Sequence, residues 1–202
     1  MNIDAIMRIA PVIPVIVIEE EAHAVPLAEA LVAGGLRVLE VTLRTPAALP
    51  AIRAMKQVPG AIVGAGTVNN PRDLDAALEA GSEFIVSPGL TETLGREAIA
   101  SGVPFLPGIA NASDIMRGLD LGLDRFKFFP AMGAGGLPAL KSLAGPFGSV
   151  RFCPTGGITL ANAAEWLAFD PVLCVGGSWV SPKGAPDKAV IEKLAKEAFG
   201  LR

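Results

Sequence analysis

The segment VLEVTLRTPAALPAIRAMKQVPGAIVGAGTV, residues 38–68, sets the pattern that the rest of the chain repeats. Its two ends, VLEVTLR (Val38–Arg44) and IVGAGTV (Ile62–Val68), are short runs rich in β-branched and other apolar residues, which is typical of strands. The chain between them is long enough for a helix, and Thr45-Pro46 is typical of a helix start. The segment therefore predicts one strand–helix–strand unit of a parallel sheet.

Runs of the same kind recur along the chain, with first residues roughly 20 to 26 positions apart. They are VIPVIVI (Val12–Ile18), VLEVTLR (Val38–Arg44), IVGAGTV (Ile62–Val68), FIVSP (Phe84–Pro88), PFLPGI (Pro104–Ile109), RFKFFP (Arg125–Pro130), RFCPTGGI (Arg151–Ile158) and VLCVGGSW (Val172–Trp179). Eight even units favour a closed barrel over an open, doubly wound sheet. We therefore expect the α/β class, with residues 1–202 forming a single compact TIM-type (β/α)8 barrel domain and an extra N-terminal helix at about Ile3–Ile9.

The boundaries of the intervening helices are marked by capping residues. Asn and Thr side chains that are suited to an N-cap precede three helical runs, at Asn70, Asn111 and Thr159. Glycines that suit a helix end stand before the next strand at Gly34-Gly35, Gly81, Gly102 and Gly122. These signals support an unbroken alternation of helices and strands.

The composition limits the classes of partner. The chain is 51% hydrophobic and only 18% charged, with a net charge of -3, so we expect a large core and a surface that favours self-association. Without a basic tract, neither nucleic acid nor an anionic membrane is an expected partner. The N-terminal stretch carries Asp4, Pro11 and Pro14 and does not resemble a secretory leader, and no apolar run is long enough to span a membrane. We expect a cytoplasmic protein.

Charged residues occur inside two of the predicted strands. In VLEVTLR, Leu39 and Val41 share one face and Glu40 and Arg44 share the other, because side chains alternate along a strand. The apolar face should pack under helices, and the polar face should then point into the barrel. Of the seven lysines, Lys127 is the one that lies within a predicted strand.

A lysine, a glutamate and an arginine in a core need partners or a chemical role, because burying an unpaired charge costs several kcal/mol. A structural ion-pair network is one interpretation. The other is catalysis: a desolvated Lys127 near a second cation such as Arg44 would have a lowered pKa and act as an amine nucleophile. Glu40 would then transfer protons.

Paired glycines follow the last two predicted strands, at Gly156-Gly157 and at Gly176-Gly177 before Ser178. In barrels that handle phosphates, the loops after strands seven and eight form the anion site from backbone N–H groups. The alternative is that the glycines serve tight turns or close packing. Two pairs at these two positions favour phosphate binding.

The remaining residues and motifs give less information about function. The single histidine, His23, is expected to be a surface or packing residue, and one histidine cannot build a multi-histidine metal site. Cys153 and Cys174 lie in strand-like runs and are expected to be buried and reduced. VGAGTV (Val63–Val68) lacks the third glycine of a dinucleotide loop, and nucleophile-elbow and P-loop motifs are missing. A metal site built from carboxylates stays open on these residues alone, and no cofactor is expected.

Several motifs together resemble one family. They are VLEVTLRT (Val38–Thr45), AIVGAGTV (Ala61–Val68), SPGLTE (Ser87–Glu92), FKFFPA (Phe126–Ala131), GPFGSVRFCPTGGI (Gly145–Ile158) and VGGSWV (Val175–Val180). In combination and in this order they look like the 2-keto-3-deoxy-6-phosphogluconate (KDPG) aldolase / 2-keto-4-hydroxyglutarate (KHG) aldolase family. The resemblance runs from about Pro11 to Val180.

The resemblance implies a trimeric TIM-like barrel and a metal-free class I lyase of the Entner–Doudoroff pathway, which cleaves its substrate to pyruvate and glyceraldehyde 3-phosphate. By motif match, Lys127 resembles the Schiff-base lysine and Glu40 the general acid/base. The remaining matches are with groups that hold the substrate. They imply that the carboxylate is held by Arg44, Thr67 and Thr155, that the phosphate is held by Gly156, Gly157 and Ser178 with Pro88 lining the pocket, and that Phe129 packs beside the lysine.

The chain departs from the family pattern at Met132, where many relatives carry an acidic residue after FKFFPA. This leaves the order of that loop and the substrate selectivity open. Other readings also stay open: an aldolase for the galactonate isomer or for an unphosphorylated keto acid, a phosphate-binding isomerase or epimerase that needs no imine, and a sugar-phosphate sensor without turnover.

Overall fold

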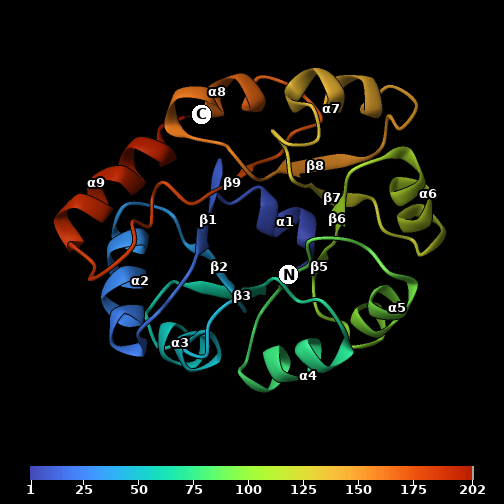
Figure 1. Ribbon diagram of the computed structural model, residues 1–202. Coiled ribbons are helices and arrows are strands. Elements are labelled where there is room, and N and C mark those ends of the chain that lie inside the picture. Colours follow the sequence, from blue (N-terminus) through green and yellow to red (C-terminus); the bar gives the residue numbers. More distant parts are fainter. Residues whose placement is uncertain (202) are drawn as a thin grey trace.

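The computed structural model describes residues 1–201 and alternates strands with helices along the chain (Figure 1). Its strands are β1 (Val12–Ile16), β2 (Val38–Thr42), β3 (Ile62–Gly66), β4 (Ile85–Val86), β5 (Phe105–Leu106), β6 (Gly108–Ile109), β7 (Arg125–Phe128), β8 (Arg151–Pro154) and β9 (Val175–Gly177). Its helices are α1 (Ile3–Met7), the 3-10 helix η1 (Glu21–His23), α2 (Ala24–Ala33), α3 (Ala48–Met55), α4 (Pro71–Glu79), α5 (Glu92–Ala100), α6 (Ala112–Asp120), α7 (Gly136–Ala144), α8 (Leu160–Leu167) and α9 (Lys188–Phe199).

The strands form two separate sheets, so the expected closed eight-stranded barrel is wrong, although the α/β class is correct. One sheet has six strands in the order β5-β4-β3-β2-β1-β9, and the other has three in the order β6-β7-β8. All the paired strands are parallel. The hydrogen-bonded ladder is interrupted at two places, and each has a local cause.

The first interruption lies within the predicted strand PFLPGI. Phe105 and Leu106 pair with β4, whereas Gly108 and Ile109 pair with β7. Between them stands Pro107, which has no N–H to donate to a ladder. Its carbonyl oxygen still accepts a hydrogen bond from the backbone N–H of Lys127, at 2.8 Å. One predicted strand therefore becomes two short ones that change partner at the proline.

The second interruption lies between β8 and β9, where isolated bridges at and beside the two strands replace a regular ladder. Phe152 is bridged to Val172, an offset of 172 − 152 = 20 positions, and Thr155 is bridged to Gly176, an offset of 176 − 155 = 21. One extra residue therefore lies on the β9 side between the two bridges. Such an insertion, like a β-bulge, breaks the regular ladder.

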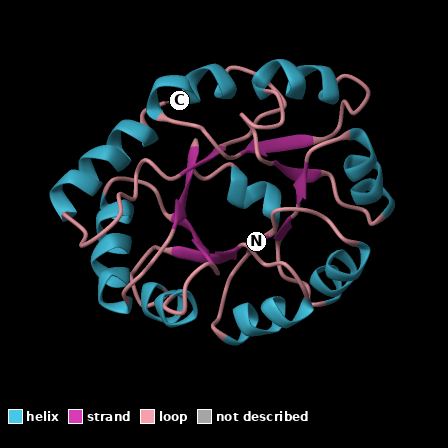
Figure 2. Ribbon diagram, viewed as in Figure 1, coloured by secondary structure: helices cyan, strands magenta, loops and turns pink. Residues whose placement is uncertain are grey.

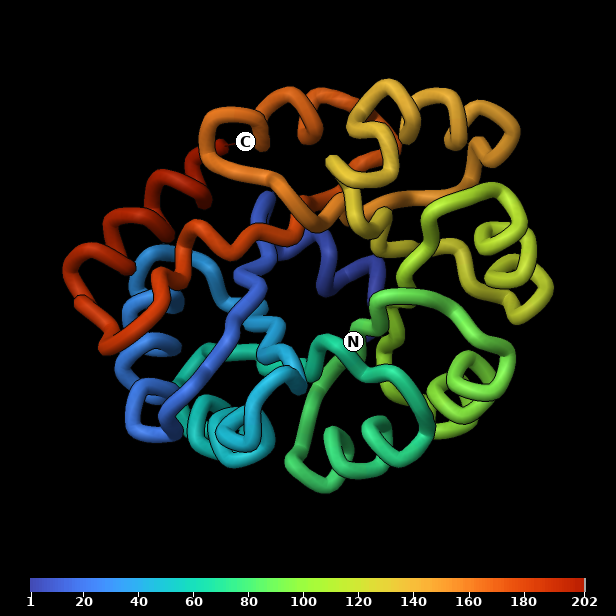
Figure 3. The backbone as a smooth tube through the Cα atoms, in the orientation of Figure 1, coloured from blue at the N-terminus to red at the C-terminus, as the bar shows by residue number. Residues whose placement is uncertain are grey.

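Apart from α1, the helices lie outside the strands, and the strands surround a central region (Figure 2). The short helix α1 lies across one end of that region, where the sequence predicted an extra N-terminal helix. The last helix, α9, packs against the first long one, α2, and the tube in Figure 3 shows these distant segments side by side. A Cβ atom on Gly34 would clash with Ala195, which shows how closely the two helices approach.

Two buried clusters separate the outer and inner faces of the strands. The outer cluster joins strand residues such as Leu39 and Val41 to helix residues such as Leu31 and Ile52. The inner cluster consists of strand residues together with Ile6 and Met7 of α1, as follows: Ile13, Val38, Ile62, Phe84, Val86, Leu106, Cys153, Leu173 and Cys174. The alternation predicted for VLEVTLR is thus confirmed, and both cysteines are buried, as expected.

Most helix starts follow the predicted caps. The side chains of Asn70 and Asn111 accept hydrogen bonds from the N–H groups of Asp73 and Asp114, and Thr159 forms a capping box with Asn162. The start predicted at Thr45-Pro46 is wrong, because α3 begins at Ala48 and the Thr45 hydroxyl instead donates to the carbonyl of Ile18.

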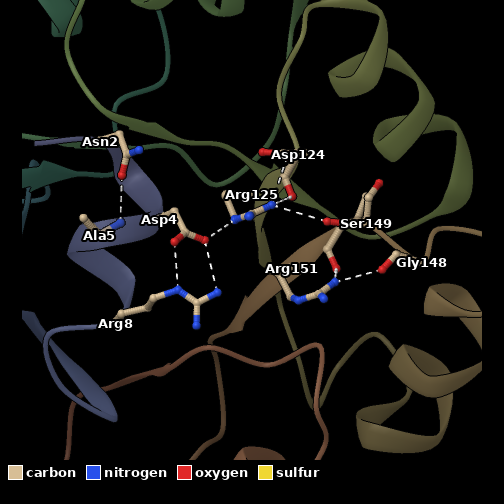
Figure 4. A network of polar contacts seen from close by, with 10 residues as sticks. Asn2, Asp4, Ala5, Arg8, Asp124, Arg125, Gly148, Ser149 and Arg151 are labelled. Atoms are coloured by element: carbon tan, nitrogen blue, oxygen red, sulfur yellow. Dashed lines mark hydrogen bonds and ion pairs between the residues drawn. The ribbon is translucent and has the colours of Figure 1, made fainter.

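A polar network ties α1 to the strands at this end of the molecule (Figure 4). The carboxylate of Asp4 accepts hydrogen bonds from Nε of Arg8 at 2.8 Å and from Nε of Arg125, at the start of β7, at 2.6 Å. Arg125 is also within 3.0 Å of the Asp124 carboxylate.

Among residues 1–201, no helix combines the length and apolar character needed to cross a membrane.

Candidate active site

Lys127 and Glu40 form an ion pair on the inner face of the strands. The distance from Nζ of Lys127 to Oε1 of Glu40 is 2.9 Å. Lys127 is 5% exposed and Glu40 is 3% exposed, so the pair is held away from bulk water. Buried charges are expensive unless they are paired, and the 2.9 Å contact meets that need. The structure therefore brings together the two groups that the sequence singled out for amine chemistry.

Small residues on the neighbouring strands make room for the pair. Lys127 stands between Gly108 of β6 and Cys153 of β8 in the sheet register. Glu40 is aligned with Gly64 of β3, and a Cβ atom on Gly66 would lie 2.7 Å from Cγ of Glu40. Any side chain at position 66 would therefore meet the glutamate.

A hollow of about 450 Å³ opens at the strand ends that lie beyond β8 and β9. It is lined by Val15, Val17, Arg44, Phe129, Thr155, Gly156, Gly157, Ile158, Gly176, Ser178, Ser181, Pro182 and Lys183. Six of the residues expected at the site, Arg44, Phe129, Thr155, Gly156, Gly157 and Ser178, are thus brought together around one space.

The hollow adjoins the ion pair through Phe129. Nζ of Lys127 lies 5.4 Å from the centre of the Phe129 ring, and this ring also lines the hollow. Thr155, another lining residue, is buried, and it follows Pro154, which is aligned with Phe128 next to the lysine. Lys127 and Glu40 are not themselves among the residues that line the hollow, and Phe129 is the lining residue that contacts the lysine.

The glycine pair after β8 presents unused donors to the hollow. Gly156 and Gly157 have φ values of +105° and +77°, which side chains other than glycine rarely adopt. In the part of the chain that the structure describes, neither N–H group donates to a protein acceptor. The carbonyl oxygen of Gly156 accepts from the N–H of Met132 at 3.1 Å, which fixes the turn. Consecutive free N–H groups of this kind suit an anion.

The family model for KDPG and KHG aldolases matches residues 3–196. The chain belongs to this aldolase family. It is 66% identical over 201 residues to the 2-dehydro-3-deoxy-phosphogluconate aldolase of Zymomonas mobilis, covering 100% of this chain and 97% of that one. It is 56% identical over 199 residues to the KHG/KDPG aldolase of Escherichia coli K12, covering 96% and 93% of the two chains.

A crystal structure from the same aldolase family shares the fold. It is the KDPG aldolase of Legionella pneumophila with pyruvate captured at low pH as a covalent carbinolamine intermediate. Its TM-score to this chain is 0.96 at 45% identity, and the alignment covers 99% of each chain.

Three residues expected at the site of this aldolase lie elsewhere than the sequence suggested. Arg44 lies beyond the end of β2, is exposed and lines the hollow, so it is not buried within the strands. Pro88 is exposed and borders a different, smaller hollow with Val68 and Thr91. Thr67 is not among the residues that line the large hollow, although it directly follows Gly66 beside Glu40.

Thr67 has a conformation that the sequence could not reveal. Its φ is +60°, and within residues 1–201 it is the one non-glycine residue with a positive φ. A β-branched residue in this region is strained, and such strain concentrates at functional sites. The family motif, and not the pattern of residues, pointed to this threonine.

No metal-binding cluster is formed among the described residues, since no three His, Cys, Asp or Glu side chains converge. His23 lies 3.9 Å from Glu20 and borders a second hollow of about 170 Å³ next to the first. Lys183 borders both hollows. The sequence did not single out this lysine, because it lies in a loop without any periodic pattern.

Proposed function

We propose that this chain is a class I aldolase that reversibly cleaves 2-keto-3-deoxy-6-phosphogluconate to pyruvate and glyceraldehyde 3-phosphate through a Schiff base on Lys127. The observation that carries the proposal is the buried pair of Lys127 and Glu40, with 2.9 Å between Nζ and Oε1. The names of the relatives from Zymomonas mobilis and Escherichia coli support the choice of substrate.

The first step forms the imine. Glu40 accepts a proton from Nζ along the 2.9 Å hydrogen bond, and the neutral amine of Lys127 attacks the C2 carbonyl carbon of the keto acid. Glu40 returns this proton to the C2 oxygen and then carries a second proton from the nitrogen to the same oxygen, which leaves as water. The product is a protonated imine whose nitrogen is that of Lys127.

The second step breaks the bond between C3 and C4. Glu40 removes the proton from the C4 hydroxyl, the C4–O bond becomes a carbonyl, and the C3–C4 electron pair moves toward the imine nitrogen. Glyceraldehyde 3-phosphate leaves, and an enamine remains on Lys127. A proton added at C3 and a water molecule added at C2 then release pyruvate and restore the amine.

The substrate is held at its two anionic ends. We assign its carboxylate to Arg44, Thr67 and Thr155, since a guanidinium can hold a carboxylate through two hydrogen bonds. We assign its phosphate to the N–H groups of Gly156 and Gly157 and to Ser178, with Phe129 beside the lysine and Pro88 near the pocket. Fixing both ends orients C2 toward Nζ, which lowers the entropic part of the barrier.

Borohydride reduction in the presence of pyruvate tests the proposal. Reduction of the imine should attach a three-carbon acid covalently to Lys127, and peptide mass mapping should locate it there. A label on another lysine, such as the exposed Lys183, or no label at all would overturn the assignment of the nucleophile. A control without pyruvate identifies background modification.

Activity measurements on a panel of keto acids test which other substrates the enzyme cleaves. We expect cleavage of 4-hydroxy-2-oxoglutarate to pyruvate and glyoxylate as a second activity, supported by the name of the Escherichia coli relative. The galactonate isomer and the unphosphorylated keto acid are the rival substrates. An isomerase or epimerase would form no covalent adduct with pyruvate, so the same trapping experiment separates that class.

We also propose that residues 1–202 act as one domain and that the protein is a cytoplasmic homotrimer. Exposed apolar side chains support self-association, with Met116 57%, Ile99 43% and Leu119 39% exposed. A doubly anionic sugar acid does not cross membranes unaided, which favours an enzyme in the compartment where the substrate is made. Light scattering that gave the mass of a monomer would contradict the trimer, and cell fractionation tests the location.

A further inference from the structure

Lys183 lies on the loop that follows β9, at the edge of the 450 Å³ hollow. The loop is anchored just before it: the hydroxyl of Ser181 donates to the carbonyl of Val15 at 3.3 Å and to that of Ser178 at 3.4 Å. A further bond at 3.2 Å joins the N–H of Ser181 to the carbonyl of Ser178. These contacts hold the backbone of the lysine beside Ser178, at the end of the hollow that we assign to phosphate.

The charges around the hollow are unbalanced. Arg44 and Lys183 are the charged residues that line it, and both are cations. Within residues 1–201, Lys183 takes part in no ion pair and no side-chain hydrogen bond, although Lys188 a few positions later is paired with Glu29. Two positive charges therefore border the hollow, and among the described residues Lys183 has no charged partner.

The substrate that we propose carries a carboxylate at one end and a phosphate at the other. Gly156, Gly157 and Ser178 offer uncharged donors, which can hydrogen-bond a phosphate but bring no positive charge to balance its negative charge. Arg44 is assigned to the carboxylate. A phosphate held by neutral donors alone would lack a neighbouring countercharge, and Lys183 is the cation that borders this space.

We propose that Lys183 binds the phosphate group of the substrate and thereby determines the preference for phosphorylated over unphosphorylated keto acids. The inference rests on the proposed function, which it extends to a residue outside the family motifs quoted above. The lysine side chain is flexible and acts as a point charge, so it can approach a phosphate from the open side of the hollow while the glycine N–H groups bind it from below.

Lys183 also borders a second hollow, which acidic residues line. Glu19 and Glu20, together with His23 and Lys183, border the adjoining 170 Å³ hollow. The lysine is therefore shared between an acidic space and an anion-binding space. A phosphate in the larger hollow would attract the ammonium group of Lys183.

The experiment compares Lys183→Met with Lys193→Met, which removes the same charge from an exposed position on α9. For 2-keto-3-deoxy-6-phosphogluconate, we expect Lys183→Met to raise KM about tenfold with kcat little changed, the size of effect expected for one charge-assisted contact. For 2-keto-3-deoxygluconate, which has the same carbon skeleton without phosphate, kcat/KM should stay within about twofold of the wild-type value. Lys183→Arg should retain most of the affinity.

Equal losses on both substrates, or no loss on either, would overturn the role of Lys183. A binding measurement separates this outcome from failure of the proposed function. Calorimetry with glycerol 3-phosphate should show binding that Lys183→Met weakens about tenfold and Lys193→Met does not. If the wild-type protein binds this ligand but cleaves no keto acid, the aldolase proposal fails and the anion site stands. If it cleaves the keto acid and Lys183→Met binds glycerol 3-phosphate normally, the inference about Lys183 fails.

Discussion

Gly66 on β3 and Glu40 on β2 fit together so closely that no other residue type can replace the glycine without moving the carboxylate. A Cβ atom on Gly66 would stand 2.7 Å from Cγ of Glu40, closer than real Cβ contacts allow. The glutamate reaches the 2.9 Å contact with Nζ of Lys127 from this position. The geometry of the buried pair, to which we assign proton transfer, therefore depends on a residue that carries no functional group.

Gly66→Ala should lower activity without unfolding the protein. The backbone at position 66 has no positive φ, so alanine is tolerated there and the cost comes from displacing Glu40. We expect kcat to fall by about 10²-fold, because a misplaced proton-transfer group loses most of its effect. The control is Gly148→Ala, where an added Cβ meets nothing within 4 Å. Unchanged kcat in Gly66→Ala would show that the glutamate can move without consequence.

Glu40→Gln should separate imine formation from cleavage. Glutamine keeps the shape and a hydrogen-bonding oxygen but cannot accept a proton, so we expect kcat to fall by about 10²–10⁴-fold. Trapping of pyruvate on Lys127 by borohydride should continue at a reduced rate. Glu97→Gln, at an exposed position on α5, serves as the control and should leave both readouts unchanged. Wild-type turnover in Glu40→Gln would remove this residue from the proton path.

Lys127 and Glu40 could be found from the sequence, because charged residues stand out in short apolar strands whose neighbours pack under helices. The alternation of strands and helices was also predicted, because short apolar runs recur at regular spacing along the chain. The division into two sheets was not predicted. It depends on the change of strand partner at Pro107 and on a one-residue change of register between the bridges Phe152–Val172 and Thr155–Gly176. The pattern of apolar residues predicts that a strand exists. Which neighbouring strand it pairs with depends on the assembled fold.

The conformation of Thr67 and the position of Lys183 could not be predicted from the local pattern of residues along the chain. The φ of +60° at Thr67 is imposed by surrounding structure, and threonine itself disfavours it. Lys183 acquires its place at the hollow through a loop whose course depends on the contact between Ser181 and Val15. Residues placed by tertiary contacts of this kind carry no periodic signal along the chain.

The buried pair should show strong coupling in stability. Lys127→Met leaves the carboxylate of Glu40 buried without its partner, so we expect it to lower the free energy of unfolding by about 3–5 kcal/mol. The double variant Lys127→Met/Glu40→Gln removes both charges and should be more stable than Lys127→Met by at least about 1 kcal/mol, while remaining inactive. Urea unfolding of the wild type, both single variants and the double variant completes the cycle. Simple additivity of the two single losses would contradict the coupling.

Thr67→Gly should affect ligand binding more than stability. Relief of the positive φ gains roughly 1 kcal/mol, and the greater backbone freedom of glycine in the unfolded chain costs roughly 0.5–1 kcal/mol. We expect these to cancel within about 1 kcal/mol in urea unfolding. Loss of the hydroxyl that we assign to the substrate carboxylate should raise KM about tenfold. A large loss of stability with unchanged KM would instead assign Thr67 a purely structural role.

The ionisation of Asp4 should make the free energy of unfolding depend on pH. Hydrogen bonds from Arg8 and then from Arg125 lower the pKa of the Asp4 carboxyl below its ordinary value of 3.8. The carboxylate is therefore more stable in the folded protein than in the unfolded chain. Its contribution is fully present above about pH 3.8 and is lost as the pH falls through the lowered pKa of the folded state.

Asp4→Asn should accordingly lower the free energy of unfolding at pH 7 by about 1 kcal/mol, because the amide oxygen can still accept hydrogen bonds from the two arginines but no longer carries the opposite charge. The difference from the wild type should shrink as the pH is lowered below 3.8, where the carboxylate of the wild type becomes protonated. Asp75→Asn, at an exposed position on α4 without an ion pair among the described residues, is the matched control. Urea unfolding at pH 7 and at pH values below 3.8 measures both variants. A difference that stayed constant across this range would show that Asp4 stabilises α1 by packing and not by its charge.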